Sequence, residues 1–160
     1  MTIATATGDE LAGVVDLFGA LTRAELEGAL GELAFKQGET VDEAAIDVAI
    51  DDAVKGYYLV AVEHDGTTLL APGPVAFPTL PDGAGDLPHI LDVDDRDPGH
   101  SVLAEAAERQ FRTDAAQAAD ADDADRIERL LDVSYDLETW GSTDVSDVRS
   151  RLDDTVENRN

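Results

Sequence analysis

All six prolines of this 160-residue chain lie within one stretch, at positions 72, 74, 78, 81, 88 and 98. Proline lacks the backbone donor of a helix and clashes with the preceding turn, so helix is excluded from most of this stretch. Glycines at 73, 83, 85 and 99 reinforce the break. We therefore divide the chain into residues 1–71, an ordered crossover of residues 72–100, and a helical region of residues 101–157.

The N-terminal region contains three capping boxes, in which a threonine precedes a glutamate by three positions. They begin at Thr7, Thr22 and Thr40. In this arrangement the hydroxyl accepts from an orphan amide while the glutamate reaches back to the cap. Apolar residues at helical spacing follow each box. The pattern predicts three helices, and the third spans residues 41–55.

The period then changes from helix to strand. Residues 57–63 are rich in aromatic and β-branched side chains, which favour a strand. Asp65-Gly66 is a strong signal for a two-residue hairpin turn, and residues 68–71 form the returning strand. Three helices followed by a β-hairpin is the order of a winged-helix-like domain.

The C-terminal region has helical periodicity again. We expect a helix over residues 101–119, a turn at residues 120–123, a second helix that ends near Gly141, and a last helix capped by Ser142 or Thr143. This region is expected to share one core with the N-terminal part. The predicted class is mostly α (α+β).

The formal charge of −25 is spread along the whole chain. Residues 1–80 carry 14 acids against 3 bases, and residues 81–160 carry 22 against 8. The acids alternate with apolar residues at helical spacing, which a disordered chain does not require. Only two bases are lysines, and aspartates outnumber glutamates 24 to 12. This composition favours adaptation to molar salt, where the screening length falls to about 3 Å.

Several classes of protein are excluded by composition. The chain has no cysteine, so it has no disulfide, thiolate metal site or cysteine nucleophile. The N-terminal Met1–Thr5 lacks the basic and apolar regions of a signal peptide, and no apolar run is long enough to span a membrane. We expect a soluble, cytoplasmic protein with no membrane contact.

In a winged-helix-like domain the third helix would enter the major groove of DNA. The acids on this helix are Asp42, Glu43, Asp47, Asp51 and Asp52. Its only base is Lys55. Phosphates would repel this face, and no Arg, Asn or Gln is placed to read a base edge. We therefore expect docking of another protein rather than direct DNA binding.

The best candidate for a metal site is the acidic run Asp92–Asp97, flanked by His89 and His100. Arg96 and Pro98 stand where a calcium loop needs a ligand and a glycine. A solvated acidic loop explains the run, so we expect no metal and no cofactor.

No spacing indicates catalysis either. The three histidines, His64, His89 and His100, are never four residues apart, and no Gly-x-Ser-x-Gly elbow or glycine-rich phosphate loop occurs. Serine, histidine and aspartate occur together in almost any chain. We expect that the protein is not an enzyme.

The remaining candidate is the apolar, proline-rich segment of residues 72–81. Val75, Phe77 and Leu80 either pack against the chain's own helices, which is favoured, or serve as docking residues on an extended strand. Tyr135 and Trp140 present the same choice, and core packing is again favoured.

The whole pattern, including the segment from Ala71 to Val93, resembles an uncharacterised family of small acidic haloarchaeal proteins. The resemblance implies salt adaptation and supplies no functional residues. We predict a non-enzymatic protein-interaction or regulatory component of a halophilic cytoplasm. The alternative is a nucleic-acid-associated transcriptional regulator, followed by a small hydrolase or metal-dependent enzyme.

Overall fold

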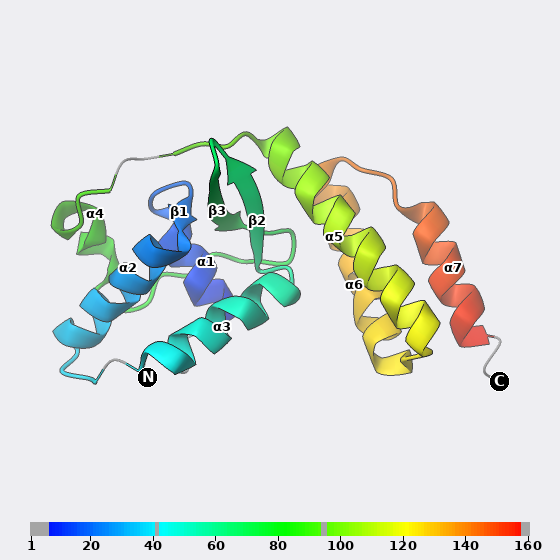
Figure 1. Cartoon of the computed structure of the whole chain (residues 1–160), viewed down its shortest axis with the longest axis horizontal. Helices are drawn as coiled ribbons and strands as arrows, with labels where there is room; N and C mark the ends of the chain where they lie inside the picture. Colours follow the sequence, from blue (N-terminus) through cyan, green and yellow to red (C-terminus); the bar gives the residue numbers. More distant parts are fainter. Residues whose placement is uncertain (1–6, 41, 94–95, 158–160) are drawn as a thin grey trace. The chain divides into compact units, whose positions relative to one another are not determined.

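The computed structural model describes residues 7–40, 42–93 and 96–157, and it divides into two compact units, residues 1–99 and 100–160. Within the described residues there are seven α-helices and one three-stranded antiparallel sheet (Figure 1). The predicted class, mostly α (α+β), is therefore confirmed. Residues 72–99, which we had separated as a crossover, group with the first unit.

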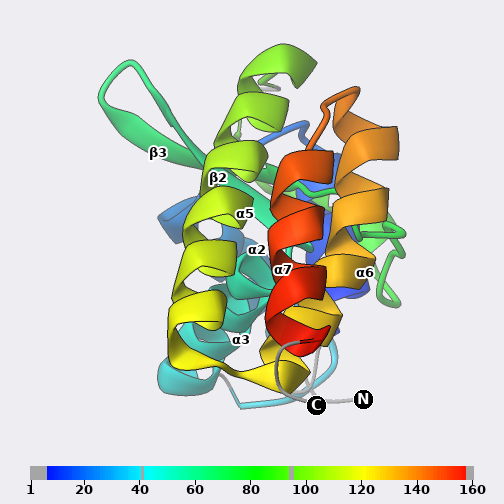
Figure 2. The same cartoon turned by 90° about the vertical axis from the view of Figure 1, so that its right-hand side faces the viewer.

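The first unit keeps the winged-helix-like order of helices and hairpin and adds a short strand after the first helix. Its elements are α1 (Gly8–Asp16), β1 (Leu21–Thr22), α2 (Arg23–Lys36), α3 (Glu43–Lys55), β2 (Leu59–His64), β3 (Thr67–Pro72), the 3-10 turn η2 (Ala84–Asp86) and α4 (Leu87–Ile90). The second unit consists of α5 (His100–Ala121), α6 (Ala124–Gly141) and α7 (Ser146–Glu157), which run alongside one another (Figure 2).

Two of the three predicted capping boxes are present. The side chains of Thr7 and Thr22 cap α1 and α2, and the glutamate of each box reaches back to the cap. The third prediction, a cap at Thr40, is wrong. Helix α3 is capped by Asp42, whose Oδ1 accepts from the amide of Ala45 at 3.2 Å. An aspartate directly before the helix reaches that amide itself, so the earlier threonine is not needed.

The sheet has the order β1-β3-β2. Strand β1 was missed because its two residues are too few to show a period; Leu21 pairs with Leu70. The predicted hairpin turn is confirmed, since Asp65 and Gly66 both have positive φ, 51° and 80°, as a type I′ turn requires.

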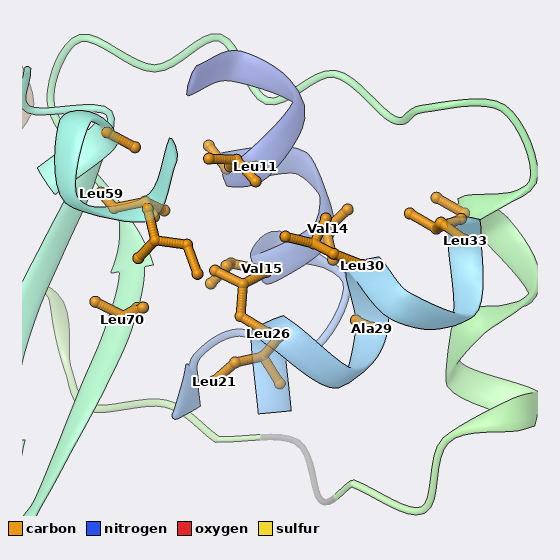
Figure 3. Packing of buried hydrophobic residues seen from close by; sticks show 14 of the residues in the cluster. Leu11, Val14, Val15, Leu21, Leu26, Ala29, Leu30, Leu33, Leu59 and Leu70 are labelled. Atoms are coloured by element: carbon orange, nitrogen blue, oxygen red, sulfur yellow. The ribbon is translucent and has the colours of Figure 1, made fainter. Parts of the chain in front are cut away.

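The core of the first unit lies between α1, α2, α3 and one face of the sheet. Figure 3 shows side chains of α1 directed toward those of α2 and of the strands. Burial of each such leucine or valine stabilises the fold by about 1.5–3 kcal/mol. The residues labelled there are Leu11, Val14, Val15, Leu21, Leu26, Ala29, Leu30, Leu33, Leu59 and Leu70.

The second unit has a core of smaller side chains. Helix α5 buries five alanines and the aromatic ring of Phe111. The predicted cap of the last helix at Ser142 or Thr143 is wrong. Ser142 takes a left-handed conformation that ends α6, and Asp144 accepts from the amide of Ser146 at 3.0 Å where α7 begins. The side chain of Asp144 is short and close enough to hold that turn.

Candidate docking surface

The proline-rich strap, which we define as residues 73–81, is held to the first unit by its backbone. It first continues the sheet, because the amide of Gly73 donates to the carbonyl of Tyr58 at 2.8 Å. It then crosses the N-terminal end of α1. There Asp9 accepts twice, from the amide of Phe77 through Oδ1 at 2.9 Å and from the amide of Thr79 through its carbonyl at 3.0 Å.

Close approach of the strap to α1 requires a glycine in that helix. A Cβ added at Gly13 would overlap the carbonyl oxygen of Thr79. The helix therefore carries a residue of low helix propensity at a buried position, and the strap lies directly on it. The backbone of the strap is part of the fold.

The side chains of the strap, in contrast to its backbone, are not all packed into the fold. Phe77 is 80% exposed and Leu80 is 49% exposed, whereas Val75 is half-buried. Our favoured expectation, that all three pack against the chain's own helices, is thus wrong for Phe77 and holds only in part for Leu80. The neighbouring prolines and the two contacts with Asp9 fix the backbone so that Phe77 cannot turn inward without breaking them.

The chain after the strap is anchored at the end of α2. Lys36 Nζ donates to the carbonyl of Gly83 at 3.4 Å and lies 3.6 Å from a carboxylate oxygen of Asp86, while the side chain of Gln37 donates to the carbonyl of Asp82 at 3.3 Å. Leu87 of the short helix α4 enters the core. Helix forms here in spite of Pro88 because proline is tolerated in the first helical turn.

Arg96 closes the first unit. Its backbone amide donates to the carbonyl of Phe18 at 3.0 Å, and its guanidinium binds both carboxylate oxygens of Glu25, with Nη2 3.0 Å from Oε2. The hydrogen bond from Arg96 is the main reason that the pKa of Glu25 is lowered from its ordinary value. We had expected Arg96 in a solvated acidic loop, and its pairing with Glu25 was not predicted.

The acidic run that we considered for a metal does not form a described site. Asp92 is exposed, and Asp97 Oδ1 accepts from the amide of Gly99 at 2.9 Å. Asp94 and Asp95 lie outside the described residues. Across residues 7–40, 42–93 and 96–157 no three His, Asp or Glu side chains gather in a way that could hold a metal ion.

The three histidines lie on three different elements. His64 is in the hairpin, 3.6 Å from a carboxylate oxygen of Asp65, and His89 is exposed on α4. His100 begins α5, where its Nε2 lies 2.6 Å from the carbonyl oxygen of Trp140 and its ring meets the indole edge-on. The contact of His64 thus stays within the hairpin, and the contacts of His100 stay within the second unit.

The acidic face of α3 is joined to α2 by Arg23. This arginine donates to the carbonyl of Asp47 at 2.9 Å, and it lies 3.0 Å from Asp51 and 3.5 Å from Glu27. A hydrogen bond with Asp47 raises the pKa of Glu27, because two carboxylates so close cannot both be charged without cost. At this face the guanidinium of Arg23 contacts acids of both helices, and the carboxylates of Glu27 and Asp47 lie close enough to repel each other when both are charged.

None of the helices in the described part of the chain has the length and hydropathy that crossing a membrane requires. No curated protein and no solved structure matches the chain. A match to the family of unknown function DUF7109 covers residues 9–157 and so includes both units. Since this match extends over nearly all of the sequence, the chain belongs to the family of unknown function DUF7109.

Proposed function

We propose that this protein is a non-enzymatic protein-interaction or regulatory component of a salt-rich cytoplasm, and that the strap is its docking surface. The observation that carries the proposal is the 80% exposure of Phe77 on a backbone held by Asp9. An aromatic ring fixed at the surface offers a partner a large apolar contact.

The rigidity of the strap supports the same function. Binding orders flexible segments at a cost in entropy, and a segment that is already fixed avoids much of this cost. Pro74 lies in a turn closed by the hydrogen bond from the amide of Ala76 to the carbonyl of Gly73, and Pro78 follows Phe77 directly, so both prolines restrict the backbone. Leu80 adds a second exposed apolar side chain. An apolar groove on another protein would accept this pair.

The test compares two phenylalanines of equal exposure. Phe77 and Phe35 are each 80% exposed, but Phe35 lies in the last turn of α2 rather than on the strap. A photo-crosslinking residue near the strap should capture a defined partner from native extract in molar KCl. Phe77→Ala should abolish this capture, and Phe35→Ala should leave it unchanged. Equal capture by both variants would contradict the proposal.

The salt-rich setting rests on the charge of −25. Self-repulsion among the acids should loosen the fold when salt is diluted to tens of millimolar, whereas molar salt screens it. Far-UV circular dichroism across a KCl series measures this. The same stability at low and molar salt would argue against adaptation to salt.

A transcriptional regulator that contacts nucleic acid is the second candidate, and the winged-helix-like order of the first unit favours it. The acids of α3 oppose it, since binding to DNA depends on cations that neutralise phosphates. We expect no binding of mixed-sequence duplexes from low to molar salt. An Asp47→Ala, Asp51→Ala variant tests the reason: tight binding by the unmodified protein that weakens in this variant would mean that the acids contact DNA through bound cations.

A further inference from the structure

The outer side of α2 carries apolar and small residues where a surface helix normally carries polar ones. Phe35 is 80% exposed in its last turn. Ala24, Gly28 and Gly31 lie on the same side of the helix, since they precede Phe35 at helical spacing. The buried residues of α2 occupy the opposite side. One apolar side of this helix therefore faces the core, and the other is open.

The two glycines on the open side are not required by the described part of the chain. At Gly13 of α1 an added Cβ would overlap the carbonyl of Thr79, whereas at Gly28 and Gly31 it would meet no atom within 4 Å. Glycine within a helix costs about 0.5–1 kcal/mol relative to alanine. The single chain would thus be more stable with alanine at both positions. What the glycines provide is a low surface that another backbone can approach closely.

Helix α3 continues this surface beside α2, to which Arg23 joins it. Val48 is 59% exposed, and Ala44 lies one turn before it on the side of α3 that faces away from the buried Ile46 and Ile50. We call the combined surface the α2–α3 face, and its members are Ala24, Gly28, Gly31, Phe35, Ala44 and Val48.

The acids beside this face outnumber the cations that neutralise them. Among the ion pairs of the described residues, Arg23 is the one base that contacts Glu27, Asp47 and Asp51. The side chains of these three acids are 40–57% exposed, so a partner can reach them. A hydrogen bond with Asp47 raises the pKa of Glu27, which shows that the two carboxylates repel each other when both are charged. A second cation placed here would relieve this repulsion.

We infer that the α2–α3 face docks an amphipathic helix of another protein, with arginines or lysines along the border of its apolar side. The apolar side covers Phe35 and Val48, and its backbone approaches over the two glycines. The bordering cations reach the acids around Arg23. A second copy of this chain fits the face poorly, because it brings the same acids and a net charge of −25. The strap lies on α1, so this surface is distinct from the docking surface proposed above.

The first test maps a synthetic probe onto the protein by amide NMR. The probe is a helical peptide of about five turns, with leucines on one side bordered by arginines, and its control has the same composition in scrambled order. Molar KCl suppresses attraction beyond about 3 Å, so direct contacts dominate. Chemical-shift changes should concentrate at Gly28, Gly31, Phe35 and Val48. Changes spread over the acids of both units, equal binding of the scrambled peptide, or no binding would each overturn the inference.

The second test uses substitutions that the single chain tolerates. Gly28→Leu fills open space on a helix and Glu27→Gln removes a repulsion, so neither should destabilise the fold. Gly28→Leu and Phe35→Ala should each weaken peptide binding by at least about tenfold. Glu27→Gln should reduce the preference for the arginine peptide over a version with glutamine in place of arginine. Phe77→Ala, on the strap, should leave binding of the peptide unchanged.

The opposite results identify other occupants. Binding that is insensitive to both Gly28→Leu and Phe35→Ala would overturn the inference, because the peptide would not lie on the α2–α3 face. Loss of binding in Phe77→Ala alone would place the peptide on the strap, which would overturn the inference and leave the proposed function standing. Sedimentation equilibrium of the unmodified protein in molar KCl tests the remaining case. Self-association that Phe35→Ala abolishes would assign the face to a second copy and would also overturn the inference.

Discussion

The two units of this protein achieve stability by different means. The first unit packs leucines, valines and isoleucines of three helices against a sheet (Figure 3). The second buries mostly alanine on α5, so its helices approach closely but remove less apolar surface from water per residue. The first unit contains 20 acids and 4 bases, and the second 16 acids and 7 bases, all of them arginines.

Arginines bridge every pair of helices in the second unit. Arg112 of α5 lies 3.0 Å from Asp147 of α7, and Arg126 of α6 lies 3.4 Å from Asp114 of α5. Arg149 of α7 binds Glu138 of α6, donates to the hydroxyl of Ser134 at 3.0 Å and covers the ring of Tyr135. A planar guanidinium can hold several such groups at once. The small core is thus supplemented by ion pairs that fix the helices against one another.

The largest effect should come from the one large side chain that α5 buries. Phe111→Ala removes a fully buried ring from a helix whose other buried residues are alanines, and we expect a loss of about 3–5 kcal/mol in the stability of the second unit. Trp140 is the single tryptophan of the sequence and belongs to this unit, so its fluorescence reports this unit directly. Val102→Ala, at an exposed position of α5, is the control and should cost less than about 0.5 kcal/mol. Equal effects of the two substitutions would show that Phe111 is not the centre of this core.

In the first unit the packing of the strap on α1 depends on Gly13. Gly13→Val would push the Thr79 carbonyl away from α1, and we expect a loss of about 1–3 kcal/mol together with faster amide exchange at Phe77 and Thr79. Gly28→Ala is the control in α2. No atom lies near its added Cβ, so it should stabilise the unit by about 0.5–1 kcal/mol. A neutral Gly13→Val would mean that the strap does not depend on this contact.

The arginine bridges provide a smaller and more selective effect. Arg149→Met keeps the length of the side chain but removes its hydrogen bonds to Glu138 and Ser134, so we expect a loss of about 2 kcal/mol in the second unit. Arg151→Met, on the exposed side of α7, should be nearly neutral. Urea unfolding followed by Trp140 fluorescence compares the two variants. If they are equally stable, the apolar core and not the bridge holds α7.

The smallest effects concern pH and occur in the first unit. The lowered pKa of Glu25 contributes stability above its ordinary value of 4.5, and this contribution is lost as the pH falls through the lower folded value. The raised pKa of Glu27 acts in the opposite sense. Its contribution to the stability of the fold is present below pH 4.5, the ordinary pKa of the group, and is lost as the pH rises through the higher pKa of the folded state. Glu25→Gln should therefore lower stability at neutral pH, and Glu27→Gln should raise it slightly. Thermal unfolding between about pH 3 and 7 tests both signs, and the same sign for both variants would contradict this account.

Local signals account for what the sequence predicted correctly. The boxes at Thr7 and Thr22 and the Asp65-Gly66 turn are interactions between residues at most three positions apart, so the sequence contains all the information they need. The box at Thr40 shows the limit of the same reasoning. Two residues, Thr40 and Asp42, could each cap α3, and only the path of the chain selects between them.

The candidate docking site was predictable in part. Composition alone indicated that the segment around Phe77 is apolar and cannot be helical. Its exposure could not be predicted, because it depends on two hydrogen bonds that strap amides donate to Asp9, a residue 68 positions from Phe77. The same holds for Tyr135, which we expected in the core and which is exposed beneath Arg149.

The sequence by itself thus determined the order of the longer helices and the β-hairpin, the hairpin turn and the acidic character, since each depends on neighbours along the chain or on composition. Only the tertiary structure decided that Arg96 binds Glu25, that Arg23 joins two helices, and that Gly13 makes room for the strap. These contacts join residues 24 to 71 positions apart. Several acids could have served as partners for each arginine, and the geometry of the packed core selects among them.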